Sequence, residues 1–183
     1  MEIKFLESLA SLRFGVLDVI MLFFTYIGEV GAVCIITALV LLIIKKTRKA
    51  GIYVAICLIL DFLIINVFLK NVVQRARPYE FSQSLVDRII SLKYKLPDDY
   101  SFPSGHSAVT FCCATALVCL LGKKALFTFV IAFLVAFSRL YIGVHYPTDV
   151  LAGAVIGSAI GFCTVYFGRK IENKFFNKNK RQE

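Results

Sequence analysis

Apolar residues are gathered into long blocks along this chain. The blocks cover residues 14–27, 30–44, 50–69, 104–121, 125–140 and 149–168. At about 1.5 Å per residue, helices of this length match a hydrocarbon core about 30 Å thick. The pattern therefore predicts an all-α integral membrane helical bundle of about six helices, with five clear spans and a short or interfacial N-terminal helix.

The N-terminal residues 1–27 differ from the later blocks. Their first half mixes charged with apolar side chains in the pattern of an amphipathic helix that lies on the membrane surface. Their second half is apolar but short for a full span. A polar loop is expected over 70–103 and a basic tail over 169–183. No internal repeat or low-complexity segment divides the chain, so 1–183 is interpreted as a single membrane domain.

Composition supports a membrane protein and argues against a nucleic-acid-binding protein. Hydrophobic residues make up 58% of the chain, and the mean hydropathy is +0.77, both above the range of soluble domains. The net charge of +9 comes from basic residues at the ends of apolar blocks, as membrane topology requires. The six cysteines lie inside apolar blocks, so neither a disulfide framework nor a metal site is predicted. No cofactor, no metal and no obligate protein partner is expected.

The basic residues also predict the orientation in the membrane. They concentrate at 45–49, at 122–124 and in the tail, which lie on one side if the later blocks span. The positive-inside rule makes that side cytoplasmic. The 70–103 loop and the 141–148 turn then lie outside. We therefore expect a multi-pass protein of the cell (plasma or inner) membrane with its polar motifs on the extracytoplasmic face.

His145 and Asp149 form the first chemical pair. Their spacing of four residues can bring the carboxylate to one imidazole nitrogen, which fixes the tautomer and stabilises a cationic ring. This is the nucleophile and orienter half of a catalytic triad. The same spacing also suits a capped helix start, because Pro147 and Thr148 are typical of one.

His106 follows Pro103, Ser104 and Gly105 at the start of an apolar block. A helix N-terminus there would offer free N–H groups to an anion, and glycine would let the backbone approach it closely. Ser104 can cap the helix or donate to a phosphate oxygen, and His106 can protonate a leaving oxygen. Taken alone, the motif favours a capped helix start without catalytic function.

Three cations complete the set, namely Lys70, Arg77 and Arg139. Together they can hold a phosphoryl group and stabilise the charge on its equatorial oxygens. Arg75 is interpreted as an accessory or solvated charge. Asn66, one turn before Lys70, could orient it.

Asp61 lies deeper in the same block, and its partner cannot be named from the sequence. A buried structural hydrogen bond is an alternative role for both Asp61 and Asn66.

These residues resemble, in order and spacing, the signature of the type 2 phosphatidic acid phosphatase superfamily. The signature is Lys-x6-Arg-Pro, Pro-Ser-Gly-His and Ser-Arg-x5-His-x3-Asp. It is matched by Lys70 with Arg77-Pro78, by Pro103-Ser104-Gly105-His106, and by Ser138-Arg139 with His145 and Asp149. No signature position departs from the pattern.

The resemblance implies a metal-independent helical membrane enzyme that works through a phosphohistidine. By position, His145 is the nucleophile, Asp149 its orienter and His106 the general acid. The phosphoryl group is then bound by Lys70, Arg77, Ser104, Gly105 and Arg139, with Ser138 as an accessory residue.

The sequence therefore predicts a hydrolase that removes phosphate from a lipid phosphate on the extracytoplasmic face. Undecaprenyl diphosphate or another polyprenyl diphosphate is the first candidate substrate. Phosphatidylglycerol phosphate, phosphatidic acid and lipid A 1-phosphate are alternatives, as is phosphotransfer to another hydroxyl. A membrane transporter that uses Asp61, Lys70 and Arg139 as intramembrane charges is the rival from a different class.

Overall fold

The computed structural model describes residues 1–11 and 15–179, without the side chains of residue 30 and residues 175–179. The start of the first apolar block, at residue 14, and the end of the basic tail, residues 180–183, lie outside the described residues. The helices are α1 (Glu2–Ser11), α2 (Gly15–Gly28), α3 (Ala32–Ile43), α4 (Arg48–Asp61), α5 (Lys70–Val73), α6 (Gln83–Ser91), α7 (Gly105–Leu121), α8 (Phe127–Ile142) and α9 (Pro147–Asn179). A π-helical segment, Phe62–Leu69, makes α4 continuous with α5. The predicted all-α bundle is confirmed.

Three helices of the described chain are long and apolar enough to cross a membrane: Arg48–Phe81, Gly105–Ala125 and Pro147–Lys174. The pair α2 and α3 would make a fourth span, bent by 53°. The 16 residues of α8 reach only about 24 Å. The expectation of five clear spans is thus met for three helices, or for four if the bent pair counts as one.

Segment 70–103 is more ordered than the expected polar loop. The preceding helix continues through Lys70 to Val73 and ends at Gln74, whose φ of 50° turns the chain. Helix α6 then forms in the middle of the segment and buries Leu85 and Ile89 on one face. This helix is short and amphipathic, so its apolar residues form no long block of the kind that marks the membrane helices in the sequence.

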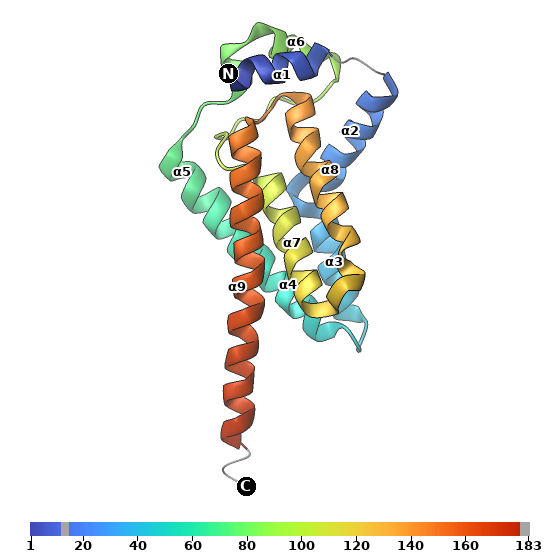
Figure 1. Cartoon of the computed structure of the whole chain (residues 1–183), viewed down its shortest axis with the longest axis vertical. Coiled ribbons are helices and arrows are strands. Elements are labelled where there is room, and N and C mark those ends of the chain that lie inside the picture. The colour runs from blue at the N-terminus through green and yellow to red at the C-terminus, as the bar shows by residue number, and fades with distance from the viewer. Residues whose placement is uncertain (12–14, 180–183) are drawn as a thin grey trace.

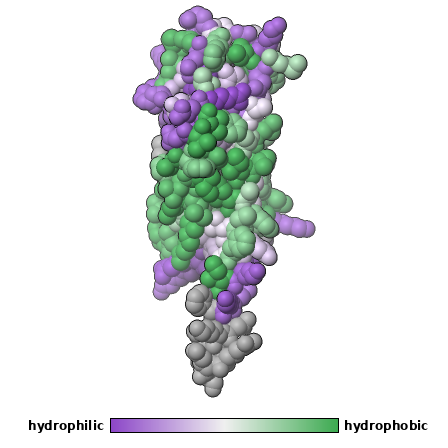
Figure 2. Space-filling view, turned by 90° about the vertical axis from the view of Figure 1, so that its left-hand side faces the viewer, coloured by the Kyte–Doolittle hydropathy of each residue, from purple (hydrophilic) through white to green (hydrophobic). Residues whose placement is uncertain are grey.

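Figure 1 shows α1 and α6 lying across one end of the bundle, while α9 extends to the opposite end. At that opposite end Lys49 pairs with Glu172, and Arg169 donates to the carbonyl of Cys119. The basic segments therefore gather at one end of the molecule. Figure 2 shows a broad apolar band between two polar ends on one face. Large side chains such as Phe62 and Val155 are exposed in the isolated chain, and lipid would cover them.

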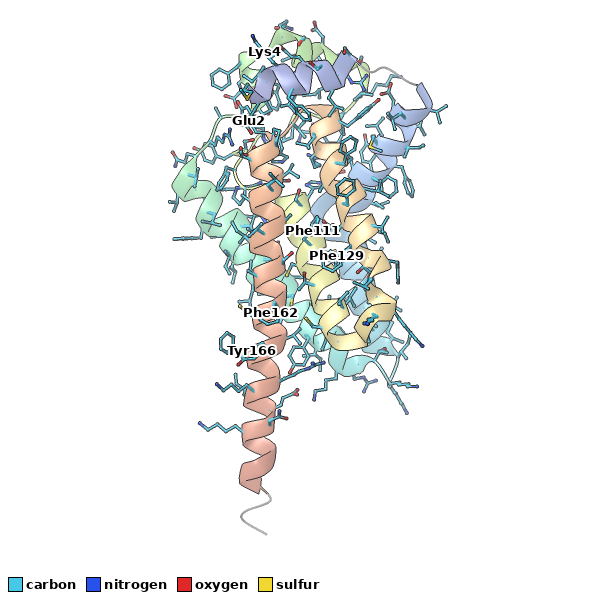
Figure 3. The ribbon with its side chains drawn as sticks, in the orientation of Figure 1. Glu2, Lys4, Phe111, Phe129, Phe162 and Tyr166 are labelled. Atoms are coloured by element: carbon cyan, nitrogen blue, oxygen red, sulfur yellow. The ribbon has the colours of Figure 1, made fainter. Side chains whose placement is uncertain are left out.

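Helix α7 occupies the centre, between α8 and α9. Phe111 and Phe129 meet edge to face between α7 and α8, with ring centroids 5.9 Å apart (Figure 3). On its other side α7 lies directly against glycines of α9, as small-residue motifs allow in membrane helices. A Cβ atom on Gly153, Gly157 or Gly161 would lie 2.5, 2.1 or 2.4 Å from the carbonyl oxygens of Ser104, Ala108 and Cys112, respectively.

We expect Gly157→Ala to destabilise the fold. The added methyl would overlap the carbonyl of Ala108, and forcing the two backbones apart costs about 1–3 kcal/mol or more. The thermal unfolding midpoint in detergent should fall. Gly15→Ala is the control because its Cβ meets no atom of the described residues within 4 Å, and its midpoint should be unchanged or slightly higher. Equal midpoints for the two variants would contradict the close contact of α7 with α9.

Candidate active site

One cavity of about 690 Å³ collects residues from all three predicted clusters. Each cluster reaches it from the end of a helix: the first from α5, the second from the start of α7, and the third from the end of α8 and the turn before α9. Its polar wall includes Lys70, Arg77, Gly105, His106, Arg139 and His145. Asn66 lies in the same wall, and a Cβ on Gly105 would fall 3.2 Å from Asn66 Oδ1.

The turn that carries His145 is specified by residues close to it in the sequence. Gly143 has a φ of +87°, which ends α8 and reverses the chain. Pro147 then begins α9, and Asp149 Oδ2 accepts from the main-chain N–H of Tyr146 at 2.9 Å. This is the reciprocal contact of a capping box. Asp149 therefore caps the start of α9, as the helix-cap interpretation predicts. In this position its carboxylate lies beside His145.

His145 is held in one tautomer by its neighbours. Its Nε2 lies 3.3 Å from Arg77 Nη1, and a guanidinium can only donate, so Nε2 carries the lone pair. Nδ1 then carries the proton and lies 3.6 Å from Asp149 Oδ2, beyond hydrogen-bond distance. The nucleophile expected from the sequence thus presents its free electron pair toward the cations.

Asp149 is fully buried and has further partners. Its Oδ2 accepts from the hydroxyl of Ser101 at 2.5 Å, and its Oδ1 accepts from Arg75 Nη1 at 2.6 Å. Arg75 also pairs with Glu2 at 2.9 Å, and Figure 3 shows Glu2 on α1 above the start of α9. Arg75, expected to be an accessory or solvated charge, therefore contacts the buried carboxylate directly.

The second cluster has a different internal arrangement from the one expected. The main-chain N–H of Ser104 donates to the carbonyl of Asp149 at 3.0 Å, which joins the start of α7 to α9. The hydroxyl of Ser104 accepts from Ser107 at 3.0 Å, and its side chain makes no cap bond to α7. His106 faces the cavity, and its buried Nε2 has no hydrogen-bond partner among the described residues.

The two adjacent residues Ser138 and Arg139 of the third cluster have different surroundings. Arg139 is 1% exposed, and its Nη1 donates to the hydroxyl of Tyr94 at 2.9 Å. The hydroxyl of Ser138 instead pairs with Thr25 at 2.7 Å, between α8 and α2. Ser138 therefore supports the helix contact, whereas Arg139 faces the cavity.

Several buried polar atoms around the cavity have no protein partner among the described residues, namely His106 Nε2, His145 Nδ1 and Arg139 Nε. Buried polar atoms are almost always hydrogen-bonded in a working state. Three cations and two imidazoles around one cavity suit an anion with several oxygens, such as a phosphoryl group. In the described part of the chain no three His, Cys, Asp or Glu side chains gather as metal ligands.

The sequence analysis missed three residues that complete the site. Asp99 accepts from both Lys70 and Arg77, Ser101 donates to Asp149, and Tyr94 accepts from Arg139. Asp99 and Ser101 immediately precede the Pro-Ser-Gly-His motif, and that proximity was the available signal. Tyr94 carried no signal, because only the folding of α6 onto α8 brings it to Arg139.

Asp61 lines the apolar part of the cavity. It is 2% exposed, and its Oδ1 has no partner among the described residues.

This chain is similar in sequence and in structure to known proteins. Residues 49–172 match the model of the PAP2 superfamily. An undecaprenyl-diphosphatase of Sulfolobus acidocaldarius is 37% identical over 154 residues, covering 84% of this chain and 71% of the relative. Undecaprenyl-diphosphatase BcrC of Bacillus subtilis is 31% identical over 148 residues, covering 81% and 73%.

Among solved structures, a transmembrane PAP2 type phosphatidylglycerolphosphate phosphatase from Bacillus subtilis is similar, with a TM-score of 0.74 and 28% identity. The match covers 93% of this chain and 85% of that one.

Stability should fall in mild acid because of His145. Burial, and then the charges of Arg77, Arg139 and Lys70, hold the pKa of His145 well below 6.5. Below pH 6.5 the imidazole is protonated in the unfolded chain but stays neutral in the folded chain. The free energy of unfolding therefore decreases as the pH falls, by up to about 1.4 kcal/mol per pH unit. Unfolding midpoints measured in detergent from pH 7.5 to 5.5 should fall more steeply for the wild type than for His145→Gln. Parallel curves would contradict this assignment.

Proposed function

This chain belongs to the PAP2 superfamily, a family of phosphatases, and we propose that it hydrolyses a polyprenyl diphosphate, with undecaprenyl diphosphate as the first candidate, through a phosphohistidine intermediate. The observation that carries the proposal is the convergence of His106, His145 and three cations on one cavity that continues into apolar walls. The same observation disfavours a transporter, because the charged residues gather near one end of the bundle.

The geometry supports a two-step reaction. In the first step His145 Nε2 attacks phosphorus, the bond to the leaving oxygen breaks, and His106 gives that oxygen a proton. Asp149 stabilises the positive charge that forms on His145. In the second step His106 takes a proton from water, the water oxygen bonds to phosphorus, and the P–N bond breaks to release phosphate. Lys70, Arg77 and Arg139 stabilise the equatorial oxygens throughout.

The shape of the cavity supports a lipid substrate. Beyond the polar wall it is lined by Ile35 of α3, by Leu58 and Ile59 of α4, and by Leu63 of the π-helical segment. An isoprenoid or acyl chain can lie against these residues while its phosphate reaches the cations. The relatives named as undecaprenyl-diphosphatases favour a polyprenyl diphosphate. The structural relative favours phosphatidylglycerol phosphate as the second candidate.

A phosphate-release panel tests the substrate. The purified enzyme in detergent receives undecaprenyl diphosphate, phosphatidylglycerol phosphate, phosphatidic acid and lipid A 1-phosphate, with excess chelator present. We expect the highest kcat/KM for the diphosphate. A parallel reaction that contains glycerol reports transfer of the phosphoryl group to a hydroxyl other than that of water. Higher kcat/KM for phosphatidylglycerol phosphate would replace the first candidate by the second.

We expect His145→Ala to abolish phosphate release, because no other side chain can form the phosphoenzyme. His106→Ala should lower kcat by about 10²–10⁴-fold, and the loss should be smaller for substrates with good leaving groups. Gly15→Ala, remote from the cavity, is the control for expression and folding. Turnover of a natural lipid by His145→Ala near the wild-type rate would contradict the phosphohistidine mechanism.

Sidedness is tested by thiol labelling. We propose that the cavity end faces outward, since the basic segments gather at the other end. In a cysteine-free variant of the chain, Gln83→Cys on α6 and Lys46→Cys between α3 and α4 introduce single exposed thiols. A membrane-impermeant reagent on intact cells should label position 83 and spare position 46. The reverse pattern would place the site in the cytoplasm.

A further inference from the structure

Asp99 pairs with both cations of the first cluster. Lys70 Nζ donates to its Oδ2 and Arg77 Nη2 donates to its Oδ1, so each carboxylate oxygen takes one cation. Lys70 and Arg77 are 7% and 2% exposed, whereas the side chain of Asp99 is 48% exposed. The carboxylate therefore lies on the solvent side of two buried cations.

This arrangement matches that of a bound phosphoryl group, whose two non-bridging oxygens would each take one of the same donors. A phosphoryl group in this place would compete with the carboxylate for those donors, because the two anions would occupy the same side of the cations and repel each other. Burial alone would raise the pKa of Asp99, but hydrogen bonding and charge from Lys70 and Arg77 outweigh it and lower the pKa to about 2. Asp99 is therefore an anion throughout the neutral range.

The side chain of Asp99 can leave without unfolding its segment. Arg77 Nε donates to the main-chain oxygen of Asp99 at 2.7 Å, and the N–H of Ser101 donates to the carbonyl of Arg75 at 2.8 Å. These backbone contacts do not involve the carboxylate. Rotation about the side-chain bonds of Asp99 is enough to free both cations.

We propose that Asp99 is an internal competitor of phosphate. Its carboxylate occupies Lys70 and Arg77 in the free enzyme, and every anion that binds there must displace it. The inference rests on the proposed phosphate-binding role of those two residues. Because all anions displace the same carboxylate, Asp99 weakens their binding by one common factor. The product phosphate then leaves readily, and anionic lipid head groups occupy the site less.

The test compares Asp99→Asn with Asp98→Asn in the full chain in detergent. Asp98 is the matched control, because it lies one residue away in the cavity lining and makes no ion pair among the described residues. The probes are inorganic phosphate and dimethyl phosphate, used as inhibitors of the hydrolysis of a short-chain lipid phosphate at constant ionic strength.

We expect Asp99→Asn to lower both inhibition constants by the same factor, about tenfold for the loss of a half-exposed charged competitor. It should raise kcat/KM by that factor, since kcat/KM also reports binding to the free enzyme. Asp98→Asn should change each value less than about twofold. Asp99→Ser is measured in parallel, so that a folding defect in one variant does not decide the result.

Unchanged or higher inhibition constants, together with a lower kcat/KM, would overturn the proposal and make Asp99 a structural support of the two cations. Unequal factors for the two probes would also overturn it. If the wild type releases phosphate from no lipid, the proposed function fails but the inference can still be tested. The rise in unfolding midpoint caused by inorganic phosphate should then be larger in Asp99→Asn than in the wild type, and equal rises would overturn it.

Discussion

The close contact between α7 and α9 is the constraint on which the site depends. Glycines on α9 let its backbone lie against the carbonyls of α7, and the contact brings the N–H of Ser104 to the carbonyl of Asp149. The second and third clusters are therefore joined through main-chain atoms. A side chain larger than glycine in this contact would move His106 relative to His145, and the proposed phosphoryl transfer would tolerate little displacement of these two groups.

The second constraint is electrostatic. Lys70, Arg77 and Arg139 are buried close to two imidazoles, and such a group of cations is costly unless anions offset it. Asp99 supplies a half-exposed charge, whereas Asp149 supplies one that is fully buried and fixed by three donors. The buried carboxylate lies beside His145, and in the role proposed for Asp99 the half-exposed one gives way to the phosphate of a substrate.

The layer formed by α1 and α6 contacts the residues that hold the buried carboxylate. Glu2 of α1 accepts from Thr148 and pairs with Arg75, which in turn holds Asp149. In the same layer Arg88 of α6 pairs with Asp18 of α2. The amphipathic helix expected at the membrane surface is thus also a part of the support for the buried carboxylate.

The sequence by itself determined the all-α membrane class and the residues of the three clusters, because long apolar blocks and fixed motif spacings are local features of the chain. It also indicated that basic segments would gather opposite the motifs. Only the tertiary structure decided that Ser138 faces α2, that Arg75 reaches Asp149, and that Asp99 pairs with Lys70 and Arg77. These contacts join residues far apart in the chain or in an irregular segment, where hydrophobic periodicity carries no information. They depend on how α8 packs on α2 and on how the segment between α6 and α7 folds back over Lys70 and Arg77.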